Sequence, residues 1–237
     1  MPLRDVLKAI PLVRPVVRPV LRALRRQIQI RARDKAWTAY AASEAVPRLD
    51  IGTSERILPG WFSVDIQPFH PGQYFMDATA RFPFPDASFA FVRSEHMIEH
   101  VPFTSGMHML RECHRVLKPG GIIRIATPDL RKFARLYDAP LSPAQEAYRK
   151  AICDHARETY GSDEPGVVIN HIYQYEGHDF IYDSGTLGEG LRKAGFVDIV
   201  ERAPGASAHP VFDGTDAHVN ADDWVTFETL TMEARKG

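Results

Sequence analysis

Two aspartates end short apolar runs early in the chain, at Asp65 and Asp77. An ionised carboxylate accepts short, strong hydrogen bonds, so Asp65 could hold the two vicinal hydroxyl groups of a ribose. Asp77 could accept a hydrogen bond from the amino group of an adenine, with the backbone amide of Ala78 facing a ring nitrogen. Aspartate also stabilises turns, so turn capping is the alternative role for both side chains.

A glycine follows the first apolar run, in the segment Leu-Asp-Ile-Gly-Thr-Ser at residues 49–54. Glycine lets a backbone approach a ligand closely, and exposed amides in such a loop can bind a carboxylate or a phosphate. A dinucleotide fingerprint needs the spacing G-x-G-x-x-G before a helix, and Gly52 has no second glycine at that spacing. Binding of a pyrophosphate is therefore disfavoured. Only residues 55–60 separate this loop from the next apolar run, so the first crossover must be abbreviated.

Histidines are the candidate bases. His96 and His100 follow the fourth apolar run, and because an imidazole titrates near neutrality, His96 is the leading candidate and His100 the second. A structural role is the alternative for each. Their spacing could suggest a metal pair, but the segment reads His-Met-Ile-Glu-His instead of H-E-x-x-H, so we predict no metal. His171 and His178 are alternative bases in a later aromatic-rich segment, which could form a lid or an aromatic cluster.

Short apolar runs alternate with helical patterns from residue 47 onward, which predicts an α/β fold with a doubly wound, mostly parallel sheet. Nearly all-apolar middle strands fit a parallel sheet that is covered on both faces. Ligands of such sheets bind beyond the carboxyl ends of the strands, where the strand order reverses. The expected strands are residues 48–51, 62–66, 74–76, 89–93, 122–126, 197–201 and 225–232, and the expected helices are residues 106–117, 144–159 and 186–194.

A basic arm at residues 1–40 precedes a single predicted domain at residues 41–237. Residues 1–35 hold ten basic and two acidic residues, a charge of +8, which leaves −9 for the rest of a chain whose net charge is −1. Prolines recur every four residues up to Pro19, so a regular helix is expected to begin only there. Residues 19–37 then form a basic amphipathic pattern. This helix could pack on its own domain, contact an anionic membrane or a protein partner, or belong to a cleavable presequence.

Composition narrows the class of protein further. The chain of 237 residues is 44% hydrophobic, enough to bury a full core. Its two cysteines lack CxxC spacing, which argues against a disulfide framework and a cysteine-ligated metal. We find no apolar run of the length of a membrane span or signal peptide, so we expect a cytoplasmic protein, with peripheral contact to a membrane surface as a further option. An acidic body also disfavours nucleic acid as a partner.

Three segments, in this order, resemble the small class I SAM-dependent methyltransferases often called type 11. They read FPFPDASF at residues 82–89, SEHMIEH at residues 94–100 and RVLKPGG at residues 115–121. The turn Leu-Pro-Gly-Trp at residues 58–61 is similar to a subgroup in which the first loop runs directly into the second strand. The match covers about residues 48–130. It implies a Rossmann-like, seven-stranded sheet and S-adenosyl-L-methionine (SAM) as the cofactor.

The resemblance also implies roles for individual residues. Gly52 and Thr53 would line the methionyl and ribose end, and Asp65 would hold the ribose. Asp77 with Ala78 would meet the adenine. The full set of candidate cofactor contacts is Asp50, Gly52, Thr53, Asp65, Asp77, Ala78, Ser94 and His96, of which the last two would border the sulfonium.

Two positions depart from the family pattern: Ser54 stands where a second glycine is usual, and Ala90 replaces a common aspartate. The predicted function is methyl transfer to an oxygen or nitrogen atom of an unidentified acceptor, a small molecule or glycan in preference to nucleic acid. One alternative is a catalytically silent subunit that binds SAM or S-adenosylhomocysteine, since both departures could be early decay. A nicotinamide-dependent oxidoreductase is the other alternative, and it would need the glycine fingerprint that Gly52 does not begin.

Overall fold

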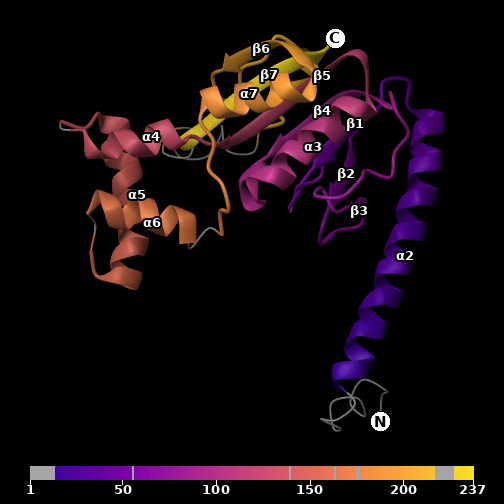
Figure 1. Cartoon of the computed structure of the whole chain (residues 1–237), viewed down its shortest axis with the longest axis horizontal. Helices are drawn as coiled ribbons and strands as arrows, with labels where there is room; N and C mark the ends of the chain where they lie inside the picture. The colour runs from indigo at the N-terminus through magenta and orange to yellow at the C-terminus, as the bar shows by residue number, and fades with distance from the viewer. Residues whose placement is uncertain (1–13, 55, 139, 163, 175–176, 217–226) are drawn as a thin grey trace.

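Seven strands form one mixed sheet in the computed structural model, which describes residues 14–237 except 55, 139, 163, 175–176 and 217–226 (Figure 1). The strand order is β3-β2-β1-β4-β5-β7-β6. The first five strands are parallel, and β7 is antiparallel to both β5 and β6. The strands are β1 (Arg48–Ile51), β2 (Phe62–Asp65), β3 (Gln73–Phe75), β4 (Phe89–Glu95), β5 (Leu117–Pro128), β6 (Phe196–Arg202) and β7 (Thr229–Lys236). This arrangement confirms the predicted Rossmann-like, mostly parallel sheet.

The helices include the three that the sequence pattern predicts. They are α2 (Arg14–Ser43), α3 (Phe103–Val116), α4 (Leu130–Ala134), α5 (Pro143–Tyr160), α6 (Pro165–Gln174) and α7 (Ser184–Ala194), with single 3-10 turns η1 (Ile98–His100), η2 (Arg135–Tyr137) and η3 (Pro210–Phe212). The expected helices 106–117, 144–159 and 186–194 correspond to α3, α5 and α7. The expected strand 225–232 begins later, at Thr229, and its first two residues lie outside the described part of the chain.

The arm helix starts earlier than the proline pattern predicts. Helix α2 begins at Arg14 and contains Pro19, whereas we expected a regular helix to begin only near Pro19. The reason is positional. Pro15 lies in the first turn, where its missing N–H has no intrahelical partner to lose. Only Pro19 therefore deprives the helix of an internal hydrogen bond.

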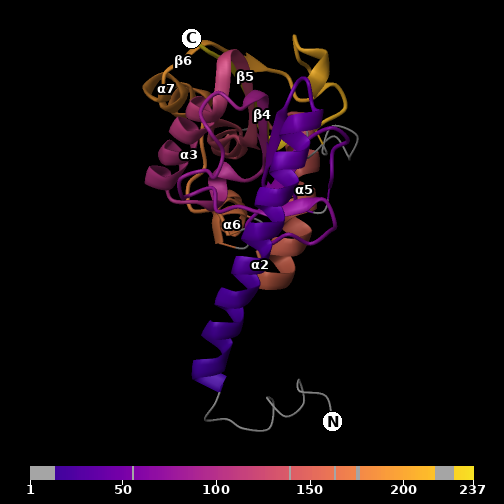
Figure 2. The ribbon, with the colours of Figure 1, turned by 90° about the vertical axis from the view of Figure 1, so that its right-hand side faces the viewer.

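One face of the sheet is apolar and is covered by α3, α7 and the C-terminal part of α2 (Figure 2). Trp37 of α2 packs its ring 5.6 Å from Phe62, 5.0 Å from Phe84 and 4.8 Å from Phe89. Burying large side chains of this kind contributes roughly 1.5–3 kcal/mol each. These contacts join the end of the arm to the core of the domain.

The opposite face carries a row of charged side chains, which the expectation of nearly all-apolar middle strands missed. Asp50, Arg93, Arg124 and Glu233 are successive cross-strand partners on β1, β4, β5 and β7. Arg93 Nη1 donates to Asp50 at 2.7 Å, and Arg124 Nη1 donates to Glu233 at 2.7 Å. We call these four residues the charged row. Because every member is buried, each charge needs its partner.

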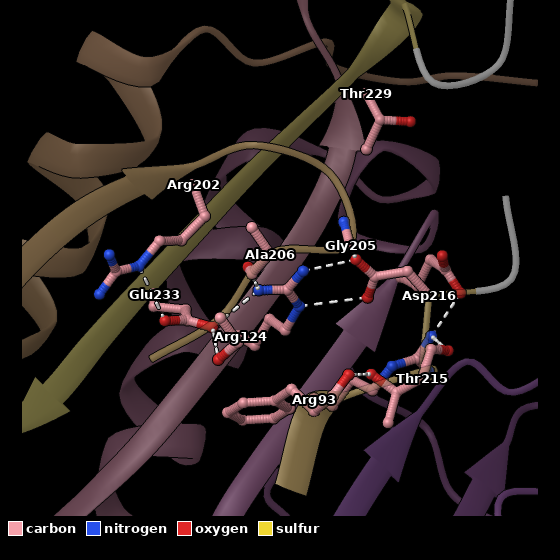
Figure 3. A network of polar contacts seen from close by, with 12 residues as sticks. Arg93, Arg124, Arg202, Gly205, Ala206, Thr215, Asp216, Thr229 and Glu233 are labelled. Atoms are coloured by element: carbon pink, nitrogen blue, oxygen red, sulfur yellow. Dashed lines mark hydrogen bonds and ion pairs between the residues drawn. The ribbon is translucent and has the colours of Figure 1, made fainter. Parts of the chain in front are cut away.

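The segment 203–216 covers the charged row (Figure 3). Arg124 donates to both carboxylate oxygens of Asp216 and to the carbonyl of Ala206. Arg93 donates to the carbonyl of Thr215 at 2.7 Å. The segment contains no regular strand or long helix. The two arginines hold it against the sheet through hydrogen bonds to its backbone carbonyls and through the ion pair with Asp216.

The charged row predicts a large effect of a single substitution. Replacing Arg124, which is 1% exposed, by methionine leaves Asp216 and Glu233 buried without their main cation. We expect Arg124→Met to lower the free energy of unfolding by about 3–5 kcal/mol, measured by urea denaturation. The matched control is Arg111→Met on the exposed side of α3, which should change it by no more than about 0.5 kcal/mol. Equal stability of the two variants would contradict the structural role of the row.

Candidate functional site

A cavity of about 270 Å³ lies at the carboxyl ends of β1, β2 and β3. It adjoins the point where the strand order reverses between β1 and β4, which is where open α/β sheets bind ligands. Its lining residues are Ile51, Gly52, Val64, Asp65, Ile66, Met76, Asp77, Ala78, Thr79, Met97, His100 and Val101. Another depression, on α5, holds no candidate residue. The first cavity therefore gathers much of the predicted site.

Asp65 ends β2 and presents its carboxylate to the cavity. Its Oδ1 accepts from the amide of Gln67 at 2.8 Å, and its Oδ2 accepts from the amide of Ser54 at 3.2 Å. Each carboxylate oxygen can accept a further hydrogen bond. The turn-capping role and the predicted ribose-binding role are thus compatible in one side chain.

Asp77 lines the same cavity from the end of β3. Its Oδ1 accepts from the amide and the hydroxyl of Thr79, at 3.0 and 2.6 Å, so the carboxylate does cap a turn. Its Oδ2 lies 3.9 Å from Nη2 of Arg26. The Arg26 guanidinium also lies 4.6 Å above the ring of Phe75. The arm therefore reaches the rim of the cavity, a contact that no local sequence pattern indicates.

Two features of the structure require a glycine at position 52: its backbone conformation and the close approach of a neighbouring side chain. Its φ is +75°, in the left-handed region, where glycine carries no steric cost. A Cβ at this position would lie 2.5 Å from Cγ of Met97. The group that approaches Gly52 in this structure is therefore Met97, which follows β4. Met97 also lines the cavity, a role that the sequence analysis did not assign.

Four predicted cofactor contacts lie outside the lining of the cavity: Asp50, Thr53, Ser94 and His96. Asp50 points to the other face of the sheet, where burial raises the pKa of its carboxyl and Arg93 opposes that rise. Thr53 is buried, and its hydroxyl accepts from Gln73 at 3.0 Å. Ser94 is also buried, and its hydroxyl makes no hydrogen bond among the residues that the structure describes. The placement of Asp50 is a correction: alternation along β1 turns it away from Ile51 and the ligand side.

His96 lies beside the cavity without lining it. Its φ of +46° is unusual for a residue with a side chain. Nδ1 lies 3.4 Å from Oε1 of Glu99, and Nε2 lies 3.3 Å from the hydroxyl of Thr229. Burial lowers the pKa of His96, but the Glu99 carboxylate outweighs that effect and raises it overall. Glu99 thus orients the imidazole, although the sequence analysis gave this glutamate no role.

His100 does line the cavity, and the fold brings His178 to it. The two rings lie 4.9 Å apart, and His100 Nδ1 is 3.3 Å from the carbonyl of Gly177. The amides of Asp179 and Phe180 donate to the carbonyl of Glu99 at 2.8 and 3.1 Å. These bonds fasten the segment after residue 176 to η1. Of the predicted alternatives, His178 therefore lies against the cavity residue His100 but does not itself line the cavity.

His171 is placed elsewhere. It is 1% exposed on α6 and packs edge-on against the ring of Tyr160. This position belongs to the helical cluster of α5 and α6, so the structure does not bring His171 to the cavity. The aromatic residues near it in sequence divide between two packing clusters.

Comparisons with known proteins found similar sequences and similar structures. A SAM-dependent methyltransferase from Archaeoglobus fulgidus has a similar structure, with a TM-score of 0.48, 18% identity and coverage of 89% of this chain and 94% of that one. A probable S-adenosylmethionine-dependent methyltransferase of Mycolicibacterium smegmatis is 39% identical over 64 residues, 27% of this chain and 24% of that protein. The demethylmenaquinone methyltransferase of Geobacillus stearothermophilus is 28% identical over 170 residues, 69% of this chain and 67% of that protein.

The matched region of this chain thus spans about a quarter of the first of these two relatives. Residues 67–125 match the family described as "Methyltransferase domain". In this region the chain is therefore similar to SAM-dependent methyltransferases. The segment that carries this match includes β3, β4, η1 and α3, and it contributes Asp77, Met97 and His100 to the cavity.

The cavity fits the nucleoside part of SAM. Two carboxylates from neighbouring strands, Asp65 and Asp77, face one space whose other walls are mainly apolar. Such a combination of apolar walls and a few convergent polar groups is typical of small-molecule sites. Asp65 would hold the ribose, and Asp77 with Ala78 would meet the adenine. When bound, SAM supplies an electrophilic methyl group.

Asp65 provides the sharpest test of this site. Asp65→Asn keeps the size of the side chain but removes its charge and one acceptor oxygen. Hydrogen bonds to charged groups contribute about 1.5–3 kcal/mol, so the affinity for S-adenosylhomocysteine should fall at least tenfold, measured by isothermal titration calorimetry. The exposed Asp213→Asn variant, on the segment after η3, is the control and should bind like the wild type. Unchanged affinity of Asp65→Asn would remove Asp65 from the ribose-binding role.

Proposed function

We propose that this methyltransferase transfers the methyl group of SAM to an oxygen or nitrogen atom of a small molecule or glycan. The observation that carries the proposal is the shared cavity, which Asp65 and Asp77 enter from adjacent strands next to Gly52. The charge of −9 on the chain after residue 35 favours an acceptor that is not a polyanion.

The reaction is a displacement in which the acceptor lone pair bonds to the methyl carbon while the C–S bond breaks and its electrons stay on sulfur. The protein mainly has to hold the reacting atoms in line, which can supply up to roughly 7–11 kcal/mol. A hydroxyl acceptor must also lose its proton. His96, oriented by Glu99, is the proposed base, and His100 at the cavity wall is the second candidate.

The two departures from the family pattern do not obstruct the cavity. Ser54 adopts a φ of +46° and donates its amide to Asp65, so it takes the backbone conformation that a glycine would have. Ala90 lies on β4, where its amide donates to the carbonyl of Pro47 at 2.7 Å. Neither side chain lines the cavity. This arrangement favours an active enzyme over a silent binding subunit.

We also propose that the arm attaches the enzyme peripherally to an anionic membrane surface from the cytoplasmic side. None of the helices in the described part of the chain is both long and apolar enough to cross a bilayer. The N-terminal half of α2 extends beyond the rest of the protein (Figure 2). Four side chains, each at least 50% exposed, lie within about 100° of the helix circumference: Val20, Leu21, Leu24 and Ile28.

The orientation of this stripe favours a surface outside the protein. By helical rotation the stripe faces away from Arg33 and Trp37, the residues with which α2 contacts the domain. With α2 in this orientation, the four side chains of the stripe therefore cannot pack on the domain. By the same rotation Arg25 borders the stripe and Arg31 continues it one turn beyond Ile28, and arginines beside an apolar stripe suit anionic lipid headgroups.

Measurements of ligand binding and of methyl transfer distinguish the proposed enzyme from a silent binding subunit and from an oxidoreductase. The wild type should bind SAM and S-adenosylhomocysteine, should not bind NADH, and should transfer labelled methyl from SAM to a component of fractionated cell extract. Binding of S-adenosylhomocysteine without transfer to any fraction would identify a silent subunit. Binding of NADH without SAM would identify an oxidoreductase.

Replacing His96 tests the proposed base. His96→Gln should bind S-adenosylhomocysteine as the wild type does but lose about 10²–10⁴-fold in the rate of transfer to a hydroxyl acceptor, measured under single-turnover conditions. His70→Gln, which changes an exposed histidine away from the cavity, is the control. A full rate in His96→Gln would exclude its role as base.

The arm is tested with lipid vesicles. The full chain should sediment with phosphatidylcholine vesicles that contain phosphatidylglycerol, less so without it, and less at high salt. Leu24→Gln with Ile28→Gln should reduce the apparent affinity at least about tenfold, since burying each side chain contributes roughly 1.5–3 kcal/mol. Ala23→Gln, exposed on the same stretch of α2 but outside the stripe, is the control. Equal sedimentation of all three proteins, or a stable dimer that the double variant abolishes, would overturn membrane attachment.

A further inference from the structure

Three potential metal ligands meet at the edge of the cavity. The ligand atoms of Glu99, His100 and His178 all lie within 4.8 Å of one another. We propose that these residues bind a divalent transition-metal ion, with Zn²⁺ as the best match. The existence of this site is independent of the proposed function, whereas its role in catalysis rests on that function.

The fold holds the three residues together by their backbones. Glu99 and His100 belong to η1, and the carbonyl of Glu99 accepts from the amides of Asp179 and Phe180. This pair of bonds brings the residue next to Asp179, His178, against His100, with ring centroids 4.9 Å apart and planes tilted by 56°. The two segments are 78 positions apart in sequence, from residue 100 to residue 178. Their alignment is a property of the folded protein, so the site is largely preformed.

The hydrogen bonds around the cluster suit metal ligation. His100 Nδ1 lies 3.3 Å from the carbonyl of Gly177. A proton on that nitrogen would donate to the carbonyl and leave the lone pair of Nε2 for an ion. A metal-binding histidine usually donates its other ring N–H to a carbonyl or carboxylate in this way.

The carboxylate of Glu99 supplies a second, independent indication. Glu99 is 0% exposed, and its Oε2 accepts from the hydroxyl of Thr127 at 2.9 Å. Its Oε1 makes no hydrogen bond among the described residues, although Nδ1 of His96 lies 3.4 Å away. This contact with His96 is long, and a buried carboxylate is costly unless its charge is well compensated. A cation bound at Oε1 would compensate this cost.

The type of ligands selects the type of ion. Two imidazoles and one carboxylate form the ligand set of many catalytic zinc sites, which keep a fourth position open. Magnesium and calcium prefer oxygen ligands throughout, so they fit this set less well. At bond lengths of about 2.1 Å, ligand atoms on one tetrahedral ion lie about 3.4 Å apart. The widest pair here must therefore close by at most roughly 1.4 Å, a distance that rotation of side chains can supply.

The position of the site connects it to the acceptor. His100 lines the cavity, so an ion on this residue would lie at the cavity wall. A Lewis acid there would lower the pKa of an acceptor hydroxyl, which could release its proton to water and attack the methyl carbon as an alkoxide. The metal would not change the methyl transfer itself: the acceptor oxygen bonds to the methyl carbon, the C–S bond breaks, and its electron pair stays on sulfur.

The experiment uses the full chain without a histidine tag, stripped of metal by a chelator. Titration with Zn²⁺ should show one site per chain by calorimetry, and Co²⁺ should give the visible absorption of a four-coordinate ion. His178→Gln and His100→Gln should each weaken Zn²⁺ binding by at least about 100-fold, with circular dichroism confirming that both variants fold. His70→Gln, away from the cluster, is the matched control. His178→Gln should keep its affinity for S-adenosylhomocysteine, because His178 does not line the cavity.

Two results would overturn the site: no Zn²⁺ bound by the wild type, or equal Zn²⁺ affinity in the wild type and both histidine variants. A failure of the proposed methyltransferase function would give a different result from these two. A protein that binds Zn²⁺ through His178 but does not bind SAM would retain the metal site and lose the methyltransferase proposal. Zn²⁺ binding together with a transfer rate that is unchanged by metal removal would overturn the catalytic role of the ion.

Discussion

The charged row across the sheet is the constraint on which the arrangement of the site depends. Arg93 and Arg124 lie next to each other in register on β4 and β5, each with an acidic partner on its outer side. Because neighbours along a strand point to opposite faces, this pairing directs Ile51 and Val92 to the apolar face. A shift of one residue in any of these strands would bury unpaired charge among hydrophobic side chains. The row therefore maintains the register that places the strand ends, and the residues beyond them, around one cavity.

Much of the fold follows from local sequence because parallel strands and their connecting helices leave strong periodic patterns. The carboxyl ends of these strands share one edge, which is why the sequence predicts a common site for Asp65 and Asp77, and both line one cavity. The same reasoning failed for Asp50. Its partner, Arg93, is 43 positions away, and no local pattern shows which face of β1 will carry a charge.

The histidines show the same limit. Their spacing in sequence suggests His96 and His100 as a pair, but the folded chain gives the two rings different partners. His96 meets Glu99 and Thr229, while His100 meets His178. The second of these contacts depends on backbone bonds between η1 and the segment after residue 176. Residues this far apart in the chain meet only in the tertiary structure, so no local sequence pattern indicates their contact. The start of α2 was missed for a different reason, since a proline in a first turn costs little.

The contact between Arg26 and Asp77 joins two parts of the molecule that otherwise have separate tasks. One residue belongs to the projecting helix, and the other belongs to the wall of the nucleoside cavity. If occupancy of the cavity changes the attraction between these two charges, thermodynamic reciprocity requires that the placement of the helix alter cofactor affinity by the same factor. The position of the helix and the occupancy of the cavity would then belong to a single coupled equilibrium.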